Sequence, residues 1–489
     1  MAKSNSILVN TISKGALNIF NIIVPILIYP YIYRILSSNT VGKIDYASTI
    51  FTYFSLVGLL GIYNYGLREI ARKRDSLLEV NKIFKNLFVL GLISNAIVFV
   101  IYAIFVYYAI SDPILKKIMY VQGLGIIGQM IYIEWVNEAN EDYTFITIKT
   151  MLIRIVSICC IFLFVKQDSD FYIYVSITTA TLIINNIISF VHIRKYVNLS
   201  ICQLFNGIEI KPLIIPLTTI LILNNTNLLY TVADKTILGI YKPAEEVAYY
   251  GIGQKVSEMV RILFLSLVYV MIPRLSYYLD NNFNAYKKGI KKIMKINIII
   301  IAPVAFGLLA LSKDIVLLFA GKQYVEAIPS MQVFSLRVLI LSTEAIVYNQ
   351  IIFLFRKEGF LMKANAICGV LNVILDLSII NFLDSTSAIF TTILCEITFQ
   401  CLCYIYISKN IKIEMGLFNL SNLKYILLAM LFIPLVTGIK YINLSSIIST
   451  TTCIAACFIL YIGVLLLIKD QTTINIVHTI LNKFKHHES

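Results

Sequence analysis

Residues 86–110 read NLFVLGLISNAIVFVIYAIFVYYAI and contain no charged side chain. The hydrocarbon core of a bilayer is about 30 Å thick, so about 20 apolar residues cross it as an α-helix. This run is therefore long enough to span a membrane once. Similar apolar runs recur along the whole chain, and only short polar segments separate them.

The composition agrees with a chain that lies mostly in lipid. Hydrophobic residues make up 58% of the sequence and charged residues 14%, whereas soluble domains are closer to half apolar and a quarter charged. We predict an all-α membrane protein with about 14 transmembrane helices. The predicted spans are 13–36, 44–66, 86–110, 117–136, 144–165, 171–193, 213–240, 247–273, 294–312, 330–355, 360–383, 386–408, 423–440 and 446–468.

The longer polar segments divide these spans into groups. We predict an N-terminal lobe of helices 1–6 (residues 1–195), a cytoplasmic linker (196–212), a C-terminal lobe of helices 7–12 (213–410), and helices 13–14 with a cytoplasmic tail (411–489). Two six-helix lobes predict a substrate path between them, as in many transporters. The predicted outer loops are too short to hold a catalytic domain.

The formal net charge of +14 is better explained by topology than by nucleic acid. Lysine and arginine are concentrated in the loops that follow even-numbered spans, and cytoplasmic loops carry such an excess. The bias predicts a multi-pass protein with both termini cytoplasmic. No folded domain presents these charges to a nucleic acid, so we expect no nucleic-acid partner.

The sequence lacks the motifs that are typical of other functional classes. The chain has no GxxxxGK[ST] sequence, so we expect no ATP-driven step. Its nine cysteines form no CxxC pair and no Cys/His cluster. We predict a transporter and not an enzyme, with no catalytic residue, metal or cofactor.

Charged residues inside the predicted spans are the candidate functional residues, because such residues are costly in a membrane and need a partner or a water-filled cavity. We predict that the cations bind an anionic substrate and that the acids carry a coupling ion, either H⁺ or Na⁺. The alternative is that they form ion pairs between helices. The cations are Arg34, Arg154, Lys235, Lys255, Arg261 and Arg337, and the candidate ion-carrying acids are Asp234, Glu258, Glu344, Asp376 and Glu396. Two further acids, Asp45 and Glu134, also lie within the predicted spans.

The eighth span carries the densest group. Lys255, Glu258 and Arg261 follow one another at intervals of three and share one side of a helix. We interpret them as a cationic wall for an anionic ligand; the alternative is internal ion pairing. Asp234 and Lys235 are adjacent and point about 100° apart on a helix, so they make no simple pair with each other.

Three stretches resemble the Wzx-type flippases of the polysaccharide transport family, within the multidrug/oligosaccharidyl-lipid/polysaccharide exporter superfamily. The first runs from Arg34-Ile35-Leu36 to Ala47, with Val41 where the family tends to carry glutamate. The second begins at Glu134-Trp135, includes Arg154, and ends at Asp170-Phe171. The third runs from Asp234-Lys235-Thr236 to Pro273-Arg274-Leu275-Ser276.

The resemblance implies a function that the residues alone do not define. Such proteins flip oligosaccharide units linked to undecaprenyl pyrophosphate from the cytoplasmic to the outer face of the bacterial inner membrane. They do so by alternating access, for O-antigen, capsule or exopolysaccharide assembly. The resemblance also implies an ion-coupled antiport, membrane lipids as neighbours, and contact with a polymerase and a chain-length regulator.

Three alternatives stay open at this point. A multidrug exporter or a lipid II flippase of the same superfamily would share the fold. A polysaccharide polymerase, from another class, is also polytopic, but we would expect a large outer loop that this chain lacks.

Overall fold

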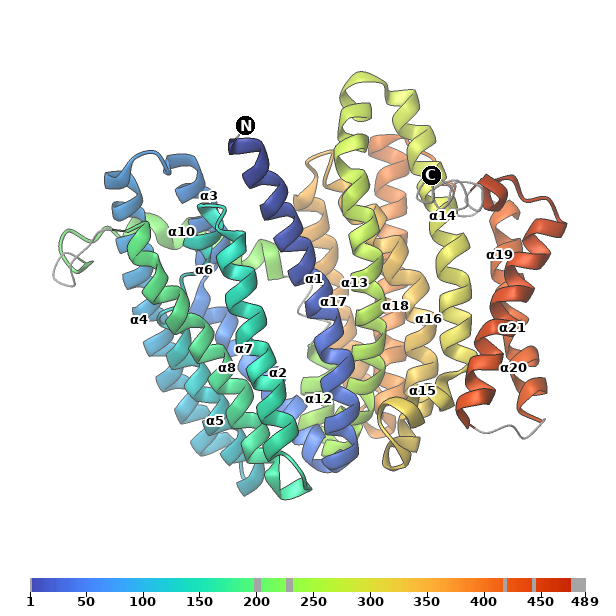
Figure 1. The fold of residues 1–489 in the computed structure, drawn as a ribbon, viewed down its shortest axis with the longest axis horizontal. Helices are drawn as coiled ribbons and strands as arrows, with labels where there is room; N and C mark the ends of the chain where they lie inside the picture. The colour runs from blue at the N-terminus through green and yellow to red at the C-terminus, as the bar shows by residue number, and fades with distance from the viewer. Residues whose placement is uncertain (1, 198–203, 226–231, 417–419, 442–445, 476–489) are drawn as a thin grey trace. The chain divides into compact units, whose positions relative to one another are not determined.

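The computed structural model describes residues 2–197, 204–225, 232–416, 420–441 and 446–475. The chain divides into two compact units, residues 1–248 and 249–489. Every regular element in the described ranges is a helix, drawn as coiled ribbons in Figure 1. The predicted all-α class is confirmed.

Unit 1 holds the helices of the N-terminal half. Short breaks separate most of them, and some breaks have a visible local cause. Asp112, for example, caps α5 by accepting hydrogen bonds from the backbone N–H groups of Ile114 and Leu115. The helices are α1 (Ala2–Ile35), α2 (Ser38–Leu59), α3 (Ile62–Lys73), α4 (Leu77–Ala109), α5 (Pro113–Gln129), α6 (Glu134–Ala139), α7 (Tyr143–Phe164), η1 (Asp168–Asp170), α8 (Phe171–His192), η2 (Ile193–Lys195), α10 (Lys211–Asn225) and α12 (Ala233–Tyr241).

The helices of unit 1 pack as a bundle in which α2 contacts α4 and α5, α5 contacts α8, and α7 contacts α1 and α8. The single tryptophan of the chain, Trp135, is fully buried in the core between α3 and α4. Its ring lies so close to Gly66 that a Cβ there would come within 2.4 Å. The core therefore extends to the short helix α6.

Unit 2 begins inside α13, which starts in unit 1. Its helices are α13 (Ala244–Asn281), α14 (Phe283–Ala310), α15 (Ser312–Phe319), η3 (Lys322–Ala327), α16 (Ile328–Ile346), η4 (Val347–Ile352), α17 (Glu358–Ser378), η5 (Ile380–Phe382), α18 (Ser385–Tyr406), η6 (Ile407–Ile411), α19 (Leu420–Met430), α20 (Phe432–Lys440) and α21 (Ser446–Leu467).

The last three helices pack on α14 and form an apolar cluster with it. Figure 1 draws α19, α20 and α21 in red at the right of the view. The Tyr461 hydroxyl of α21 donates to the Ile299 carbonyl of α14 over 2.9 Å. A separate core joins α13, α14, α16, α17 and α18. Helix α14 thus belongs to both clusters and holds the C-terminal helices to the rest of the unit.

Twelve helices in the described ranges are long and apolar enough to cross a membrane, so the predicted count of about 14 is not confirmed. The fourth predicted span, 117–136, corresponds to α5, which ends at Gln129; Glu134 instead begins α6. The seventh, 213–240, is divided between α10 and α12, with residues 226–231 outside the described ranges. Residues 130–133, between α5 and α6, carry no charge, so the sequence does not mark the end of α5.

The assignment of helices to two lobes stays a prediction. Helices α10 and α12, which the prediction places at the start of the second lobe, contact α3 and α2 respectively. Part of the predicted linker (198–203) and of the predicted cytoplasmic tail (476–489) lies outside the described residues.

Candidate functional site

Helices α2 and α12 bring together three charged side chains in unit 1. Lys235 Nζ lies 3.5 Å from Asp45 Oδ2, and these side chains are 11% and 13% exposed. Asp234, adjacent to Lys235 on α12, is fully buried. Lys235 therefore pairs with a residue on another helix. This agrees with the helix geometry, in which the adjacent side chains 234 and 235 point about 100° apart.

Close backbone packing makes this contact between α2 and α12 feasible. A Cβ added to Gly239 would lie 2.0 Å from the Tyr46 ring, and one added to Gly42 would lie 1.7 Å from the Ala244 carbonyl oxygen. The Asn39 side-chain amide also donates to Glu245 Oε1 over 2.8 Å. Gly42 lets the first turns of α2 and α13 meet directly, and Gly239 lets α12 approach the Tyr46 ring of α2.

The other two predicted cations of unit 1 lie elsewhere. Arg154 of α7 is partly buried and donates to the Asn21 side-chain oxygen of α1. Arg34 is exposed in the last turn of α1. Arg34 and Arg154 thus differ in exposure, and the partner found for Arg154 is Asn21 on α1.

One buried pair was not predicted from the sequence. Lys149 Nζ of α7 lies 2.8 Å from Glu134 Oε2 of α6, and the two side chains are 2% and 12% exposed. The Ser189 hydroxyl of α8 donates to the same carboxylate. The pair could have been predicted from Lys149, because this lysine lies within the apolar run of α7, about one and a half turns after the helix begins.

Unit 2 contains a deeply buried ion pair between two helices. Arg337 of α16 donates from Nη2 to Glu396 Oε1 over 2.6 Å and from Nε to both carboxylate oxygens over 2.9 and 3.0 Å. The two side chains are 6% and 1% exposed. This pair agrees with the alternative interpretation of the charged residues, in which they form ion pairs between helices and do not bind substrate.

Glu344 lies two turns along α16 from Arg337, within electrostatic range of Arg337, Glu396 and Arg261. Its Oε2 atom is buried and accepts no hydrogen bond from the described residues. A buried carboxylate oxygen without a partner is costly unless it takes up a proton or a cation. Glu344 is therefore the candidate ion-binding carboxylate of unit 2.

On α13, the predicted cationic wall contains an ion pair within one helix. Arg261 Nε donates to Glu258 Oε2 over 2.7 Å, and the side chains are 38% and 44% exposed. Lys255, two turns before Arg261, is half-buried. Glu258 thus partly neutralises Arg261, while both groups stay accessible.

The remaining acid, Asp376 of α17, is fully buried. The Thr391 hydroxyl of α18 donates to its Oδ1 atom. Nearby on the same helices, Asn372 donates to the Thr392 hydroxyl over 3.3 Å. Polar contacts therefore join α17 to α18 inside an otherwise apolar bundle.

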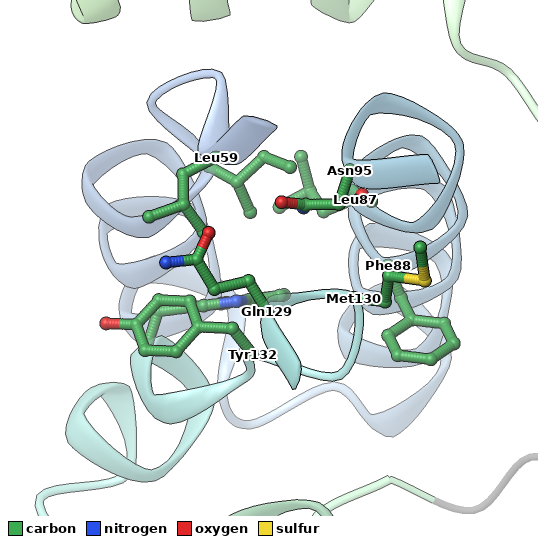
Figure 2. Close-up of a pocket in the computed structure, with 10 residues that line it drawn as sticks. Leu59, Leu87, Phe88, Asn95, Gln129, Met130 and Tyr132 are labelled. Atoms are coloured by element: carbon green, nitrogen blue, oxygen red, sulfur yellow. Dashed lines mark hydrogen bonds between the residues drawn. The ribbon is translucent and has the colours of Figure 1, made fainter. Parts of the chain in front are cut away.

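A small cavity lies in unit 1 between α2, α4 and the end of α5, where Asn95 and Gln129 extend from facing helices in Figure 2. Its volume is about 10 Å³ and most of its lining is apolar. That volume suits about one water molecule. The cavity is too small for a sugar, so it is not a substrate site.

Twelve described helices are long and apolar enough to cross a membrane, and charged side chains lie within them, some paired and some accessible. These features define a multi-pass membrane protein. Residues 7–279 match the family model described as "Polysaccharide biosynthesis protein", and the chain belongs to this family. The resemblance seen in the sequence is thereby confirmed.

Comparison with individual proteins gives the same class. The chain is 24% identical over 318 residues to the "Putative O-antigen transporter" of Shigella dysenteriae, covering 62% of this chain and 75% of that protein. Among solved structures, the fold is similar to the lipid II flippase MurJ in an inward closed conformation, with a TM-score of 0.70, 14% identity, and coverage of 94% of this chain and 99% of MurJ. It is also similar to an inward-facing multidrug resistance MATE family transporter of the MOP superfamily, with a TM-score of 0.58, 11% identity, and coverage of 82% and 96%.

Proposed function

We propose that this transporter flips an oligosaccharide linked to undecaprenyl pyrophosphate from the cytoplasmic to the outer face of the bacterial inner membrane. The observation that carries the proposal is the match to the polysaccharide biosynthesis family in a chain whose whole fold is that of a flippase. The relative named as an O-antigen transporter supports the same substrate class. The positive-inside bias supports cytoplasmic termini.

Two side chains on α13 are the best candidates to bind the anionic headgroup. Arg261 is 38% exposed and Lys255 is half-buried, so a ligand reaches both more easily than it reaches Arg337. A pyrophosphate would compete with Glu258 for the Arg261 guanidinium, since both are anions. Such competition lets the site bind and then release its substrate.

Ion coupling is the second part of the proposal. The unpartnered Oε2 atom of Glu344 makes this residue the favoured carrier of H⁺ or Na⁺. We consider the other predicted acids to be weaker candidates for carrying the ion: Asp234, Asp376, Glu258 and Glu396. Glu396 in particular is held by Arg337 through three hydrogen bonds, so its negative charge is already compensated.

The test is reconstitution of the purified protein in liposomes that contain an undecaprenyl-pyrophosphate-linked oligosaccharide, with a membrane-impermeant lectin reporting sugar on the opposite face. We expect flipping by the wild type and its loss in Lys255→Ala and Arg261→Ala. Lys322→Ala, a change at an exposed lysine of η3, is the matched control. Equal flipping in liposomes without protein would overturn the proposal, and preference for lipid II would assign the chain to the alternative flippase.

A further inference from the structure

A basic hollow lies at one end of unit 2, outside the charged groups described above. It has a volume of about 480 Å³ and is lined by Asn284, Lys287, Lys288, Lys291, Lys412 and Glu414. We refer to it as the lysine hollow. Four lysines and one glutamate give the lining a formal charge of +3, so the hollow suits an anion.

One wall is the first part of α14. The helix begins after the Asn282 cap, whose side chain accepts from the Ala285 N–H. Lys287 and Lys288 lie in one turn of the helix and Lys291 lies one turn further on, while Tyr286 and Ile290 are fully buried. The helix therefore packs on its apolar side and presents lysines on the other.

The second wall is the segment that follows η6. Ile411, Ile413 and Met415 are buried in the core of unit 2, whereas Lys412 and Glu414 between them are exposed. Lys412 ends η6 in the left-handed conformation, with φ 58° and ψ 46°. The buried residues on either side anchor the segment in the core, and Lys412 and Glu414 line the hollow.

Glu414 is the internal counter-charge. Its carboxylate lies 2.8 Å from Lys291 Nζ. The hydrogen bond and charge of Lys291, and then the charge of Lys287, lower the pKa of Glu414 below its usual range. Among the described residues, no ion pair is found for Lys288 or Lys412, which leaves two cationic groups for a ligand.

The hollow lies next to the apolar part of α14, which begins after Lys295. Lys288 precedes Lys295 by about 10 Å along the helix axis, a separation that suits contact with lipid phosphates. Phe283, at the turn between α13 and α14, is 38% exposed, and Lys287 Nζ lies 4.7 Å from its ring centroid. In Figure 1 this turn projects beyond the neighbouring helices of unit 2. An excess of lysine beside the end of an apolar helix is typical of the cytoplasmic side of a membrane.

We propose that the lysine hollow binds the phosphate headgroup of a membrane lipid in the cytoplasmic leaflet. Two lipids carry this chemistry: an anionic phospholipid of the bilayer, and the undecaprenyl pyrophosphate of the substrate. Only the second depends on the function proposed above. In that case the hollow holds the headgroup before it enters the transport path.

The test is equilibrium binding to the purified full-length protein in detergent. The probes are phosphatidylglycerol, undecaprenyl pyrophosphate, zwitterionic phosphatidylcholine and inorganic pyrophosphate. The variants are the triple Lys287→Gln/Lys288→Gln/Lys412→Gln, the corresponding triple arginine variant, and Glu414→Gln. Lys116→Gln/Lys313→Gln/Lys322→Gln removes the same charge outside the hollow, and thermal unfolding checks that each variant is folded.

Near a membrane surface each lysine strengthens binding of an anionic lipid about fivefold, so the triple glutamine variant should weaken phosphatidylglycerol or undecaprenyl pyrophosphate roughly a hundredfold. The arginine variant and the control triple should bind as the wild type does, and Glu414→Gln should bind more tightly. Loss confined to undecaprenyl pyrophosphate identifies the substrate, and equal loss for both lipids identifies a general phospholipid site. Unchanged binding of both lipids in the triple glutamine variant, or equally tight phosphatidylcholine, would overturn the proposal. Because binding is measured without transport, its failure is distinguishable from failure to flip.

Discussion

Arg337 and Glu396 form a bidentate ion pair between α16 and α18, with both side chains less than a tenth exposed. The residues are 59 positions apart in the chain. Removing one partner leaves an uncompensated buried charge, whereas removing both leaves none. Substitutions at this pair are therefore expected to change the free energy of unfolding, which can be measured separately from transport.

We expect Glu396→Gln and Arg337→Met each to destabilise the protein by about 3–5 kcal/mol. The double variant should recover much of that loss. Thermal unfolding in detergent measures both, with Glu258→Gln at a half-exposed pair as the control. Additive losses in the double variant would show that the two side chains act independently.

Lys149 should behave in the same way in unit 1, because it is 2% exposed and paired with Glu134. We expect Lys149→Met to cost about 3 kcal/mol and Lys149→Met/Glu134→Gln to cost less. The exposed pair Lys82–Glu209 is the control, since breaking a surface pair costs under about 1 kcal/mol. Equal effects at the two sites would contradict the burial argument.

Glu344→Gln should remove the dependence of transport on an ion gradient while leaving the fold intact, since its Oε2 atom has no hydrogen-bond partner to lose among the described residues. The measurement is flipping in liposomes with imposed pH and sodium gradients. Asp314→Asn, outside this cluster, is the comparison variant. If the Glu344→Gln protein responds to both gradients as the wild type does, another acid carries the ion.

Gly42 tolerates no side chain at the contact between α2 and the start of α13. A Cβ there would lie 1.7 Å from a backbone oxygen, so backbone must move. We expect Gly42→Ala to destabilise by about 1–3 kcal/mol. Gly307 in α14 has no atom within 4 Å of an added Cβ, so Gly307→Ala should be neutral or stabilising by up to about 1 kcal/mol. Similar unfolding temperatures for the two variants would refute the predicted contrast.

Asp470 joins the end of α21 to the start of α19. Its burial raises the pKa, but hydrogen bonds from Lys424, the Thr473 N–H and the Tyr425 hydroxyl outweigh that effect and hold it well below its usual range. A lowered folded-state pKa contributes stability above the unfolded pKa, near 3.8, and that contribution is lost as the pH falls further.

We therefore expect Asp470→Asn to unfold at a lower temperature than the wild type at pH 7, with the difference shrinking below about pH 4. Thermal unfolding between pH 7 and pH 3 measures this difference. The variant Asp75→Asn, at an exposed aspartate, should show no such pH-dependent difference. A gap for Asp470→Asn that is constant over this range would argue against the ionised carboxylate as the cause.

The sequence by itself determined the fold class, because spanning a membrane depends on local apolar length. The run 86–110, for example, lies almost wholly within α4. It also identified most of the buried charges, since a charged residue within an apolar run is visible without a structure. The boundary of the fourth span was less accurate, because α5 ends at Gln129 inside an uncharged run that gives no local sign of a break.

Only the tertiary structure decided which charges neutralise one another. Arg337 and Glu344 share a helix face in the sequence, yet Arg337 pairs with Glu396 of α18 and leaves a Glu344 oxygen without a hydrogen bond from the described residues. The lysine hollow likewise combines the start of α14 with a segment more than 100 residues later. Ion pairs act over a few ångströms, and the sequence does not specify which distant helices approach that closely. The same local signal, a charge in an apolar run, therefore marks both structural pairs and candidate binding groups.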